Sequence, residues 1–286
     1  MRKAGMRAAL LAALALLALA APPVARTALG FERIVSLAPS MTETLYALGL
    51  GDKVVGVTAF CDYPPEAREK PAVGGMSNPS LEAVVSLRPD LVVLTTDGNP
   101  KEFEERLRSL GIRTYVFRAR TMGELPAGIR EMGEALGVGE RAGALASRME
   151  ATFREMAVGA ARPARRVLFL IWPEPLIVAG PGTAMDDALR LLGQKNIVSE
   201  SGVGIGYPKY SVEEVLRQAP EVIFIGKGHA DMRKLSRRLL DRLRSTPAVR
   251  EGKVFFVSDR LYRLGPRVPA GVEELAALLD ELGGKR

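Results

Sequence analysis

Residues 80–94 read SLEAVVSLRPDLVVL, and residues 211–225 read SVEEVLRQAPEVIFI. The two segments align without a gap at an offset of 131 residues. Each starts with Ser, has Glu two positions later and continues as an apolar helical stretch. Each then has Pro, an acidic residue and four apolar residues, which is typical of a buried strand. Two copies are too few for a solenoid, so this long-period repeat predicts two lobes of similar build.

Two weaker similarities between the halves of the chain occur in the same order, one before and one after each copy of the repeat. The pattern Leu-x-x-Leu-Gly at 45–49 returns at 189–193, and Leu-Arg-Ser at 107–109 returns at 243–245. Around the first copy the sequence predicts strands and helices in alternation, namely strands at 33–37, 53–59, 91–95 and 113–117 and helices at 40–48, 81–87 and 101–109. Alternation of this kind predicts an α/β fold with mainly parallel sheets covered on both faces.

The second half of the chain repeats the alternation. Predicted strands lie at 166–171, 222–225 and 253–257, and predicted helices at 184–192, 211–219, 231–243 and 271–282. Two further helices are expected between the copies, over 121–136 and from about 139 to 159. Capping boxes, in which a Ser or Thr is followed three residues later by Glu, are expected at Ser40–Glu43 and Thr121–Glu124.

The long helix between the copies suggests a domain division. We expect an N-terminal α/β lobe at 29–138, a connecting helix at 139–161 and a C-terminal α/β lobe at 162–286. The alternative is an ordinary crossover helix within one domain.

The first residues of the chain have the pattern of an export signal. Arg2, Lys3 and Arg7 are followed by the apolar residues 8–21 and then by small residues. The apolar run is shorter than the ~20 residues of an ordinary membrane span. No Cys follows it, so no lipoprotein anchor is predicted. We expect a signal peptide at 1–28 and a soluble protein exported to the periplasm.

Charge and composition narrow the function classes. The net charge of +7 falls to +3 without residues 1–28, which hold four basic and no acidic residues. The clusters Arg233-Lys234 and Arg237-Arg238 therefore indicate a solvated helix face rather than a nucleic-acid surface. Cys61 and His229 are the only residues of their types. This inventory argues against an internal disulfide, a His/Cys zinc site and, unless His229 is the base, a Ser-His-Asp triad.

The candidate ligand-contacting residues follow the predicted strands. Parallel α/β sheets bind ligands at the carboxyl ends of their strands, and bulky ligands favour aromatic contacts there. In this chain those loops are aromatic or stiffened by Pro and Gly. They contain Ser40, Phe60, Tyr63 and 97–99 in the first half, and Trp172, Tyr207, Tyr210 and Asp259, Arg260, Leu261, Tyr262 and Arg263 in the second. Core packing is an equal alternative for Trp172.

Glu82 and Glu213 occupy the same position in the two copies of the repeat. A carboxylate in the first turn of a helix favours the helix dipole by about 0.3–1 kcal/mol, which is a sufficient structural reason for both. The functional alternative is that each Glu lies at the outer tip of its lobe and docks on a two-fold symmetric partner.

Several segments resemble one known family. RIVSLAPSMTETLYALGLGDKVVGV, FCDYPPEA, the first repeat copy and LRSLGIRTYVF are similar to the substrate-binding proteins that serve ABC importers of cobalamin, ferric siderophores and haem. The resemblance covers nearly the whole chain after the signal peptide and is greatest to the members that bind cobalamin. It implies two α/β lobes joined by one long helix, with the ligand held between them and little hinge motion.

The resemblance also implies roles for residues. Phe60 and residues 259–263 fall on ligand-contacting positions, and Trp172 and Tyr207 replace other aromatic pocket positions. Glu82 and Glu213 match two glutamates that dock on arginines of a permease dimer in the inner membrane. The implied protein is a monomer that carries cobalamin or a related corrinoid, with no intrinsic cofactor, no metal site, no catalytic residue and no nucleic-acid partner.

The sequence departs from the family pattern in ways that leave the ligand open. Gly74 and Thr95-Thr96 stand where tryptophans are expected, and a paired-cysteine bridge is missing. Haem, with Tyr63 as an axial candidate, and an anionic ferric siderophore, with Arg260, Arg263 and Arg267 as candidates, remain alternatives. Two alternatives from other classes are an exported α/β enzyme using Asp62, Asp97 and Asp259, and a sensor module for a membrane receptor.

Overall fold

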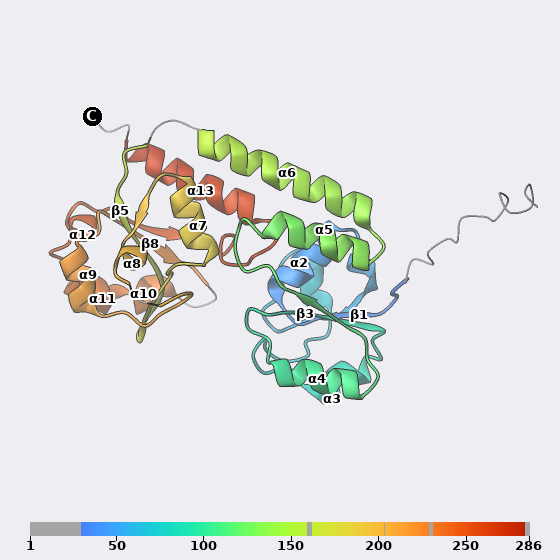
Figure 1. Cartoon of the computed structure of the whole chain (residues 1–286). Helices are drawn as coiled ribbons and strands as arrows, with labels where there is room; N and C mark the ends of the chain where they lie inside the picture. The colour runs from blue at the N-terminus through green and yellow to red at the C-terminus, as the bar shows by residue number, and fades with distance from the viewer. Residues whose placement is uncertain (1–29, 159–161, 203, 229–230, 284–286) are drawn as a thin grey trace, which may run out of the picture. The chain divides into compact units, whose positions relative to one another are not determined.

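The N-terminal half of the chain builds a four-stranded parallel sheet. The computed structural model describes residues 30–158, 162–202, 204–228 and 231–283. The strands β1 (Ile34–Ser36), β2 (Val54–Gly56), β3 (Leu91–Thr95) and β4 (Thr114–Phe117) lie in the order β2-β1-β3-β4, and all three pairings are parallel (Figure 1). The predicted strands are confirmed, although β2 is shorter than the predicted 53–59. It begins after a 3-10 helix at 51–53 and ends at Gly56, beyond which Val57 makes only an isolated bridge with Ala72.

The C-terminal half builds the second sheet, which differs from the first at one edge. β5 (Arg166–Pro173), β8 (Val222–Gly226) and β9 (Val254–Val257) are parallel, whereas β6 (Leu176–Val178) pairs with β5 in the antiparallel sense. The short β7 (Lys195–Asn196) also pairs with β5. No strand was predicted at β6, because prolines and glycines surround its three residues.

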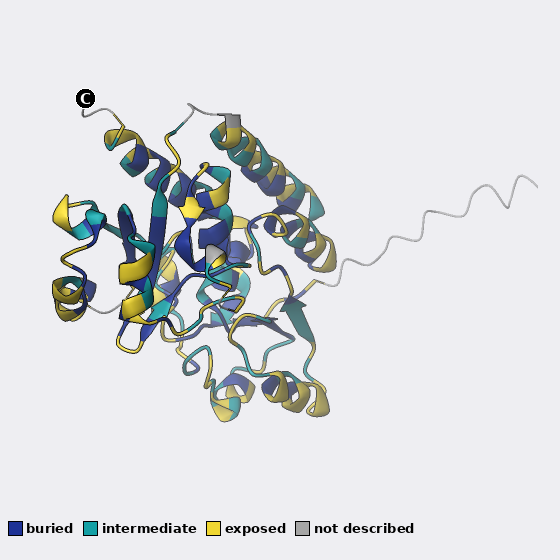
Figure 2. Cartoon of the chain, turned by 60° about the vertical axis from the view of Figure 1, so that its left-hand side comes forward, coloured by how far each residue is buried: buried dark blue, intermediate teal, exposed yellow. Residues whose placement is uncertain are grey.

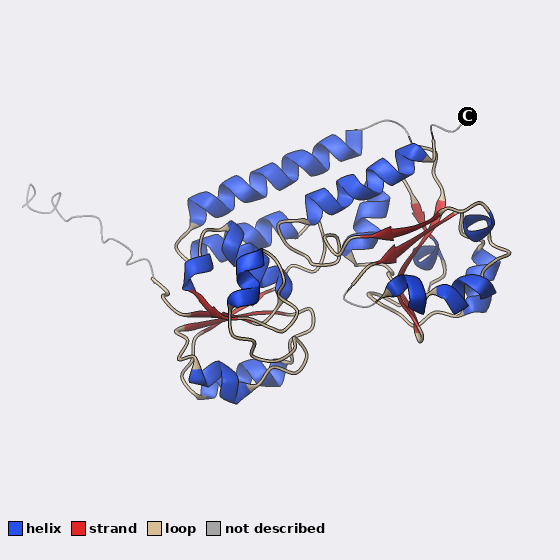
Figure 3. Cartoon of the chain, turned by 180° about the vertical axis from the view of Figure 1, so that it is seen from behind, coloured by secondary structure: helices blue, strands red, loops and turns tan. Residues whose placement is uncertain are grey.

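Helices cover the two sheets on both faces (Figure 3). Around the first sheet lie α2 (Pro39–Ala47), α3 (Leu81–Ser86), α4 (Lys101–Ser109), α5 (Leu125–Ala135) and a second 3-10 helix (Pro65–Glu69). Around the second lie α7 (Ala184–Leu191), α8 (Ile197–Glu200), α9 (Val212–Gln218), α10 (Met232–Leu235), α11 (Arg237–Arg242), α12 (Pro247–Arg250) and α13 (Val268–Glu281). No helix in the described part of the chain is long and apolar enough to cross a membrane.

The 20-residue helix α6 (Gly139–Val158) packs on elements from both halves of the chain. It contacts α5, which precedes it, and α7 and α13, which belong to the second half (Figure 1). These contacts suit the expected connecting helix, although the division of the chain into lobes at 139 and 161 remains a prediction. For brevity we call the part around the first sheet the N-terminal lobe and the part around the second the C-terminal lobe.

Alternating strand residues divide the core into one shared and two separate clusters. In β3, Leu91 and Val93 face one side of the sheet while Val92 and Leu94 face the other; in β8, Phe224 and Ile225 divide in the same way. The inner sides of both sheets join a single cluster, and each outer side has its own. Figure 2 shows buried residues along the strands and on parts of the helices that cover them. Residues 31–286 accordingly form one compact unit.

The repeat predicted from the sequence is present in the structure. α3 and β3 in one copy match α9 and β8 in the other at the same offset, and the side chains of Ser80 and Ser211 cap their helices. Both helices end at a left-handed residue before a proline, Arg88 with φ 48° and Ala219 with φ 46°. A residue before proline avoids the α region, so both helices end there.

A second match between the copies escaped the sequence analysis. Arg33, just before β1, donates through Nε to the carbonyls of Leu87 and Arg88, and Arg166 donates to those of Gln218 and Ala219. Each arginine thus satisfies carbonyl groups at the end of the repeat helix. The acidic residue after the proline completes the arrangement by accepting from the backbone N–H of the same arginine, at 3.1 Å for Asp90 and 2.9 Å for Glu221.

One expected capping box is wrong and one is displaced. Ala38 is the N-cap of α2, with Pro39 in the first turn, and no side chain caps the helix. Glu43 instead points away from the helix start to two arginines of the other lobe. Thr121 and Glu124 do exchange hydrogen bonds, at 3.3 and 3.4 Å, but the regular helix begins only at Leu125.

Candidate functional site

A cavity of about 330 Å³ lies where loops from the two lobes meet. Its lining is mostly apolar and aromatic, with one carboxylate and one guanidinium. The described residues that line it are Pro39, Ser40, Phe60, Met76, Thr95, Asp97, Phe117, Ala119, Gly228, Tyr262, Arg263 and Leu264. Apolar cavities with a few polar groups are the usual form of small-molecule binding sites.

The cavity is built at the carboxyl ends of the parallel strands, as the sequence predicted. Ser40 follows β1, Asp97 follows β3, and Phe117 is the last residue of β4. From the C-terminal lobe, Gly228 follows β8 and residues 262–264 follow β9. The sheet edges of the two lobes therefore supply opposite walls, which is where open α/β sheets place ligands.

Asn99 holds the loops of the N-terminal wall together. Its side-chain oxygen accepts from the backbone N–H of Thr95 at 2.8 Å. Its amide nitrogen donates to the carbonyls of Leu37 at 2.9 Å and Met76 at 2.8 Å. One side chain thus joins the ends of β1 and β3 to the loop of Met76, and so fixes the position of three parts of the wall.

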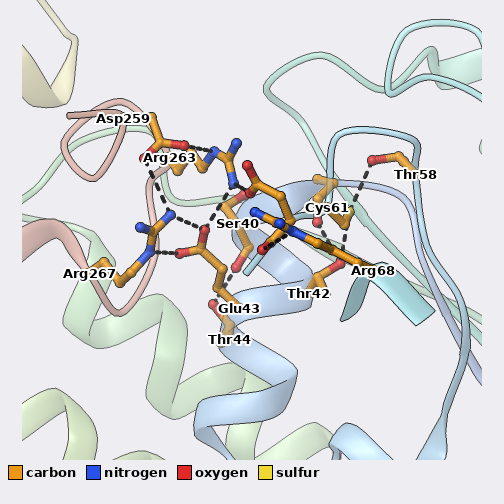
Figure 4. Close-up of polar contacts among 12 residues, drawn as sticks. Ser40, Thr42, Glu43, Thr44, Thr58, Cys61, Arg68, Asp259, Arg263 and Arg267 are labelled. Atoms are coloured by element: carbon orange, nitrogen blue, oxygen red, sulfur yellow. Dashed lines mark hydrogen bonds and ion pairs between the residues drawn. The ribbon is translucent and has the colours of Figure 1, made fainter. Parts of the chain in front are cut away.

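Cys61 fixes the loop that carries Phe60. The thiol is buried and lies 3.1 Å from the hydroxyls of both Thr42 and Thr58 (Figure 4). Burial raises the pKa of Cys61, while the hydrogen bonds from the two threonines and the charge of Arg263 act in the opposite direction. The cysteine is therefore a protonated packing residue beneath the site.

Behind the cavity, an ionic cluster joins the two lobes. Glu43, whose side chain is fully buried, accepts from Arg267 Nε at 2.8 Å and lies 3.3 Å from Arg263 (Figure 4). Arg263 also pairs with Asp62 and, at 2.7 Å, with Asp259. Glu43 and Asp62 come from the N-terminal lobe and the other three from the C-terminal lobe, so the pairs connect the two lobes.

The same cluster determines the charge at the back wall. Burial alone would lower the pKa of Arg263, but the hydrogen bond that Arg263 donates to Asp62 and the charges of Asp259, Asp62 and Glu43 outweigh it and raise the pKa. Arg263 is therefore a permanent cation whose charge three carboxylates already balance. Asp97 adds a further negative charge at the cavity wall.

The sequence-predicted site residues divide into two groups. Ser40, Phe60, Tyr262 and Arg263 line the cavity, and Asp259 lies behind them in the ionic cluster. Leu261 is 2% exposed and packs in the shared core, while Arg260 is exposed outside the cavity lining.

Tyr63 and Trp172 also lie away from the cavity lining. The Tyr63 ring packs against Arg267, with the guanidinium carbon 4.4 Å from the ring centre, and borders a separate hollow beside α2. Trp172 belongs to the β5–β6 hairpin and donates through Nε1 to the carbonyl of Glu174 at 2.9 Å. Their predicted ligand contacts, and that of Leu261, remain untested.

Tyr207 lies near the cavity without lining it. Its side chain is 42% exposed, yet the surrounding protein and the nearby negative charge of Asp97 raise its pKa. Tyr207 belongs to the C-terminal lobe, whereas Asp97 belongs to the N-terminal wall of the cavity.

The two repeat glutamates are both exposed on short outer helices. Glu82 lies in the first turn of α3 and Glu213 in the first turn of α9. Glu213 lies 3.8 Å from Arg242 of α11, and its side chain is 78% exposed. The equivalent positions keep both carboxylates available to a partner.

Sequence reasoning missed several residues of the site. Met76, Phe117, Ala119 and Leu264 line the cavity, and Glu43 belongs to the ionic cluster behind it. Phe117 was detectable as the last residue of a predicted strand. The role of Glu43 was not recognised, because a Glu three residues after a Ser fits a capping box and its ion pairs with the other lobe leave no local pattern.

No metal-binding group is found in the described ranges, where no three His, Cys, Asp or Glu side chains come close enough to hold an ion. His229 lies outside the described residues, as do the predicted signal peptide at 1–28 and its cleavage site.

Comparison with known proteins places the chain in a family. The family model described as periplasmic binding protein matches residues 34–261. The crystal structure of the periplasmic vitamin B12-binding protein BtuF of Vibrio cholerae is 30% identical, covers 89% of this chain and 99% of its own, and has a TM-score of 0.75. The structure of the periplasmic heme-binding protein RhuT from Roseiflexus sp. RS-1, in apo form, is 29% identical. The match covers 88% of this chain and 99% of RhuT, with a TM-score of 0.80.

A curated relative adds a transport context. An uncharacterised ABC transporter substrate-binding lipoprotein of Bacillus subtilis is 32% identical, with 86% of this chain and 79% of the relative covered. The family match spans both sheets and most of the cavity lining described above. The chain therefore belongs to the periplasmic binding protein family.

Proposed function

We propose that this protein captures cobalamin or a related corrinoid and delivers it to an ABC permease in the inner membrane. The observation that carries the proposal is the apolar, aromatic cavity with walls from both lobes. Its relatives include a vitamin B12-binding protein and an ABC transporter substrate-binding lipoprotein.

The charges around the cavity favour a corrinoid over an anionic chelate. Among the described lining residues Arg263 is the one cation, and three carboxylates already balance it. Arg267 is paired with Glu43, and Arg260 lies outside the lining. A ligand with several carboxylates would therefore lack the unpaired arginines that such groups require.

Haem remains the second candidate, because a heme-binding protein is among the similar structures. Tyr262 is the tyrosine of the cavity lining, and its hydroxyl accepts from the N–H of Gly228 at 2.6 Å. Burial raises the pKa of Tyr262, which disfavours the phenolate needed to coordinate ferric iron. The hydrogen bond and the raised pKa of Tyr262 therefore favour a corrinoid over haem as the ligand.

A binding role without catalysis fits the carboxylates of the site better than the enzyme alternative. Asp62 and Asp259 pair with Arg263, which leaves Asp97 as the carboxylate among the described lining residues. Paired acid–base catalysis needs two carboxyl groups at the reacting atoms. Recovery of the ligand unchanged after incubation with the protein is the expected result, and turnover would revive the enzyme alternative.

Phe60 and Tyr63 provide a matched test of the binding site. Their side chains are 47% and 45% exposed, but only Phe60 lines the cavity. Phe60→Ala should weaken cyanocobalamin binding about tenfold, or about 1.4 kcal/mol, whereas Tyr63→Ala should leave it unchanged. Absorbance titration of the purified protein measures both affinities. Equal losses in the two variants would contradict the cavity assignment.

We propose that Glu82 and Glu213 dock the protein on the permease. Their matched positions on α3 and α9 suit a two-fold partner. The double variant Glu82→Arg, Glu213→Arg should bind ligand normally and fail to support transport in reconstituted vesicles. A control with two other exposed first-turn glutamates, Glu102→Arg and Glu140→Arg, should transport normally. Unchanged transport by the first variant would refute the docking role.

Export through a signal peptide at 1–28, periplasmic location and a monomeric state complete the proposal. Mass measurement of the protein recovered from the periplasm should give a mature chain that begins near residue 29, with no lipid attached. A protein that keeps residues 1–28 would contradict the export prediction.

A further inference from the structure

A basic surface covers the outer side of the C-terminal lobe at α10 and α11. Residues 231–244 contain six Lys or Arg and two Asp, whereas residues 31–283 as a whole contain 34 basic and 33 acidic residues. The excess positive charge of the folded chain is therefore concentrated here. We call the residues Arg233, Lys234, Leu235, Arg237, Arg238 and Arg242 the α10–α11 surface.

The segment is amphipathic, so its charges are held on one side. Met232, Ser236, Leu239 and Leu243 recur at helical spacing and are buried against the second sheet. The basic residues between them are exposed. Leu235, 44% exposed, lies among these cations, which gives the surface an apolar centre.

Most of the cations on this surface form no ion pair within the described part of the protein. Across the described residues, no ion pair involves Arg233, Lys234, Arg237 or Arg238. The guanidinium of Arg233 lies 4.5 Å from the ring centre of Phe256 and remains charged. Folding therefore does not account for four neighbouring cations, and they are available to an external anion.

The surface lies beside one of the two repeat glutamates. Arg242, at the end of α11, is 3.8 Å from Glu213 at the start of α9 (Figure 1). The described N-terminal lobe has no equivalent basic surface after β3, because the three basic residues of α4 are matched by three acidic ones, Glu102, Glu104 and Glu105. If Glu213 meets a permease, α10 and α11 lie beside that contact.

We propose that the α10–α11 surface contacts the anionic phospholipid headgroups of the membrane that holds the permease. The inference rests on the proposed function for the location of that membrane. Exposed Lys and Arg with a central leucine form the combination that binds an interface through charge and apolar contact. The contact holds the C-terminal lobe near the membrane and presents Glu213 to the permease.

Vesicle co-sedimentation tests the proposal. Residues 31–286, the compact unit described above, should bind vesicles that mix phosphatidylglycerol with phosphatidylcholine and not vesicles of phosphatidylcholine alone. Binding should fall at least tenfold between about 0.01 M and about 1 M salt, since the Debye length falls from about 30 Å to about 3 Å. Arg233→Glu, Arg237→Glu, Arg238→Glu should reduce binding at low salt at least tenfold.

A matched variant separates location from net charge. Arg106→Glu, Arg148→Glu, Arg154→Glu makes the same change in charge at exposed arginines of α4 and α6 and should keep most of the binding. Equal losses in the two variants would overturn the proposal. So would unchanged vesicle binding with impaired transport in the first variant, because the surface would then meet the permease itself.

Cyanocobalamin titration of the same variants separates this inference from the proposed function. Normal ligand binding with lost vesicle binding supports the membrane contact. Vesicle binding that depends on α10–α11 in a protein that binds no corrinoid would support the surface and refute the ligand. Circular dichroism checks that each variant is folded.

Discussion

The two lobes share their central helix and strand but differ at their edges and loops. Arg88 and Ala219 have the same left-handed backbone, and Arg33 and Arg166 satisfy the same helix-end carbonyls. In contrast, the edge strand next to β1 is parallel and the hairpin strand next to β5 is antiparallel. The repeated part therefore builds the framework, while the unrepeated parts make the edges of the two lobes different.

The same contrast extends to the site. The N-terminal lobe supplies an apolar wall with Phe60, Met76 and Phe117. The C-terminal lobe supplies Tyr262 and Arg263 from the loop after β9. Two similar frameworks thus present unlike surfaces to one cavity, which suits the proposed ligand if its two faces differ.

The largest effect is expected from the ion pairs that join the two lobes. Glu43→Ala leaves Arg263 and Arg267 close together without their shared buried carboxylate. Breaking a buried pair in this way costs about 3–5 kcal/mol. Urea unfolding should show the loss as a lower midpoint. Glu150→Ala, which removes the exposed partner of Arg130, should leave the midpoint unchanged. A shift no larger than that control would mean that the cluster does not hold the lobes together.

A smaller effect, on ligand affinity, should come from reversing the charge of Asp97 on the N-terminal wall of the cavity. Asp97→Arg places a cation where the cavity now has a carboxylate. The substitution should improve the affinity for haemin, which carries two carboxylates, by about tenfold relative to cyanocobalamin, a change of about 1.4 kcal/mol. Absorbance titration with both ligands gives the ratio, and Glu102→Arg outside the cavity is the control. A ratio that stays constant would remove Asp97 from ligand selection.

The smallest effect tests how closely the copies match. Arg88→Gly and Ala219→Gly relieve a left-handed backbone that costs a side-chain-bearing residue about 1–2 kcal/mol, against the entropic cost of glycine of about 0.5–1 kcal/mol. Each should stabilise the protein by up to about 1 kcal/mol in urea unfolding. Arg106→Gly, within the regular helix α4, should destabilise it by a similar amount. Opposite signs at the two repeat positions would show that the copies are not equivalent.

The framework was predictable because it depends on local patterns. The strand patterns and the caps at Ser80 and Ser211 are local, and each copy of the repeat lies within fifteen residues. The contacts of Arg33 with the end of α3 join residues more than fifty positions apart, so no local pattern showed them.

The site was predictable only in part for the same reason. Loops at strand ends indicated Ser40, Phe60, Tyr262 and Arg263, because the carboxyl ends of parallel strands share one edge. The Glu43–Arg267 pair joins residues more than two hundred positions apart, and a local capping pattern competed with it. Tyr63 follows Phe60 by three residues but contacts Arg267 in a separate hollow, because the loop turns between them.

Isothermal titration calorimetry of the purified protein with cyanocobalamin, repeated with haemin, tests the central claim most directly. Binding of one cyanocobalamin per chain, lost in part in Phe60→Ala and kept in Tyr63→Ala, is the predicted result. Saturation by haemin at one per chain with no cyanocobalamin binding would contradict the corrinoid assignment while keeping the fold and the family.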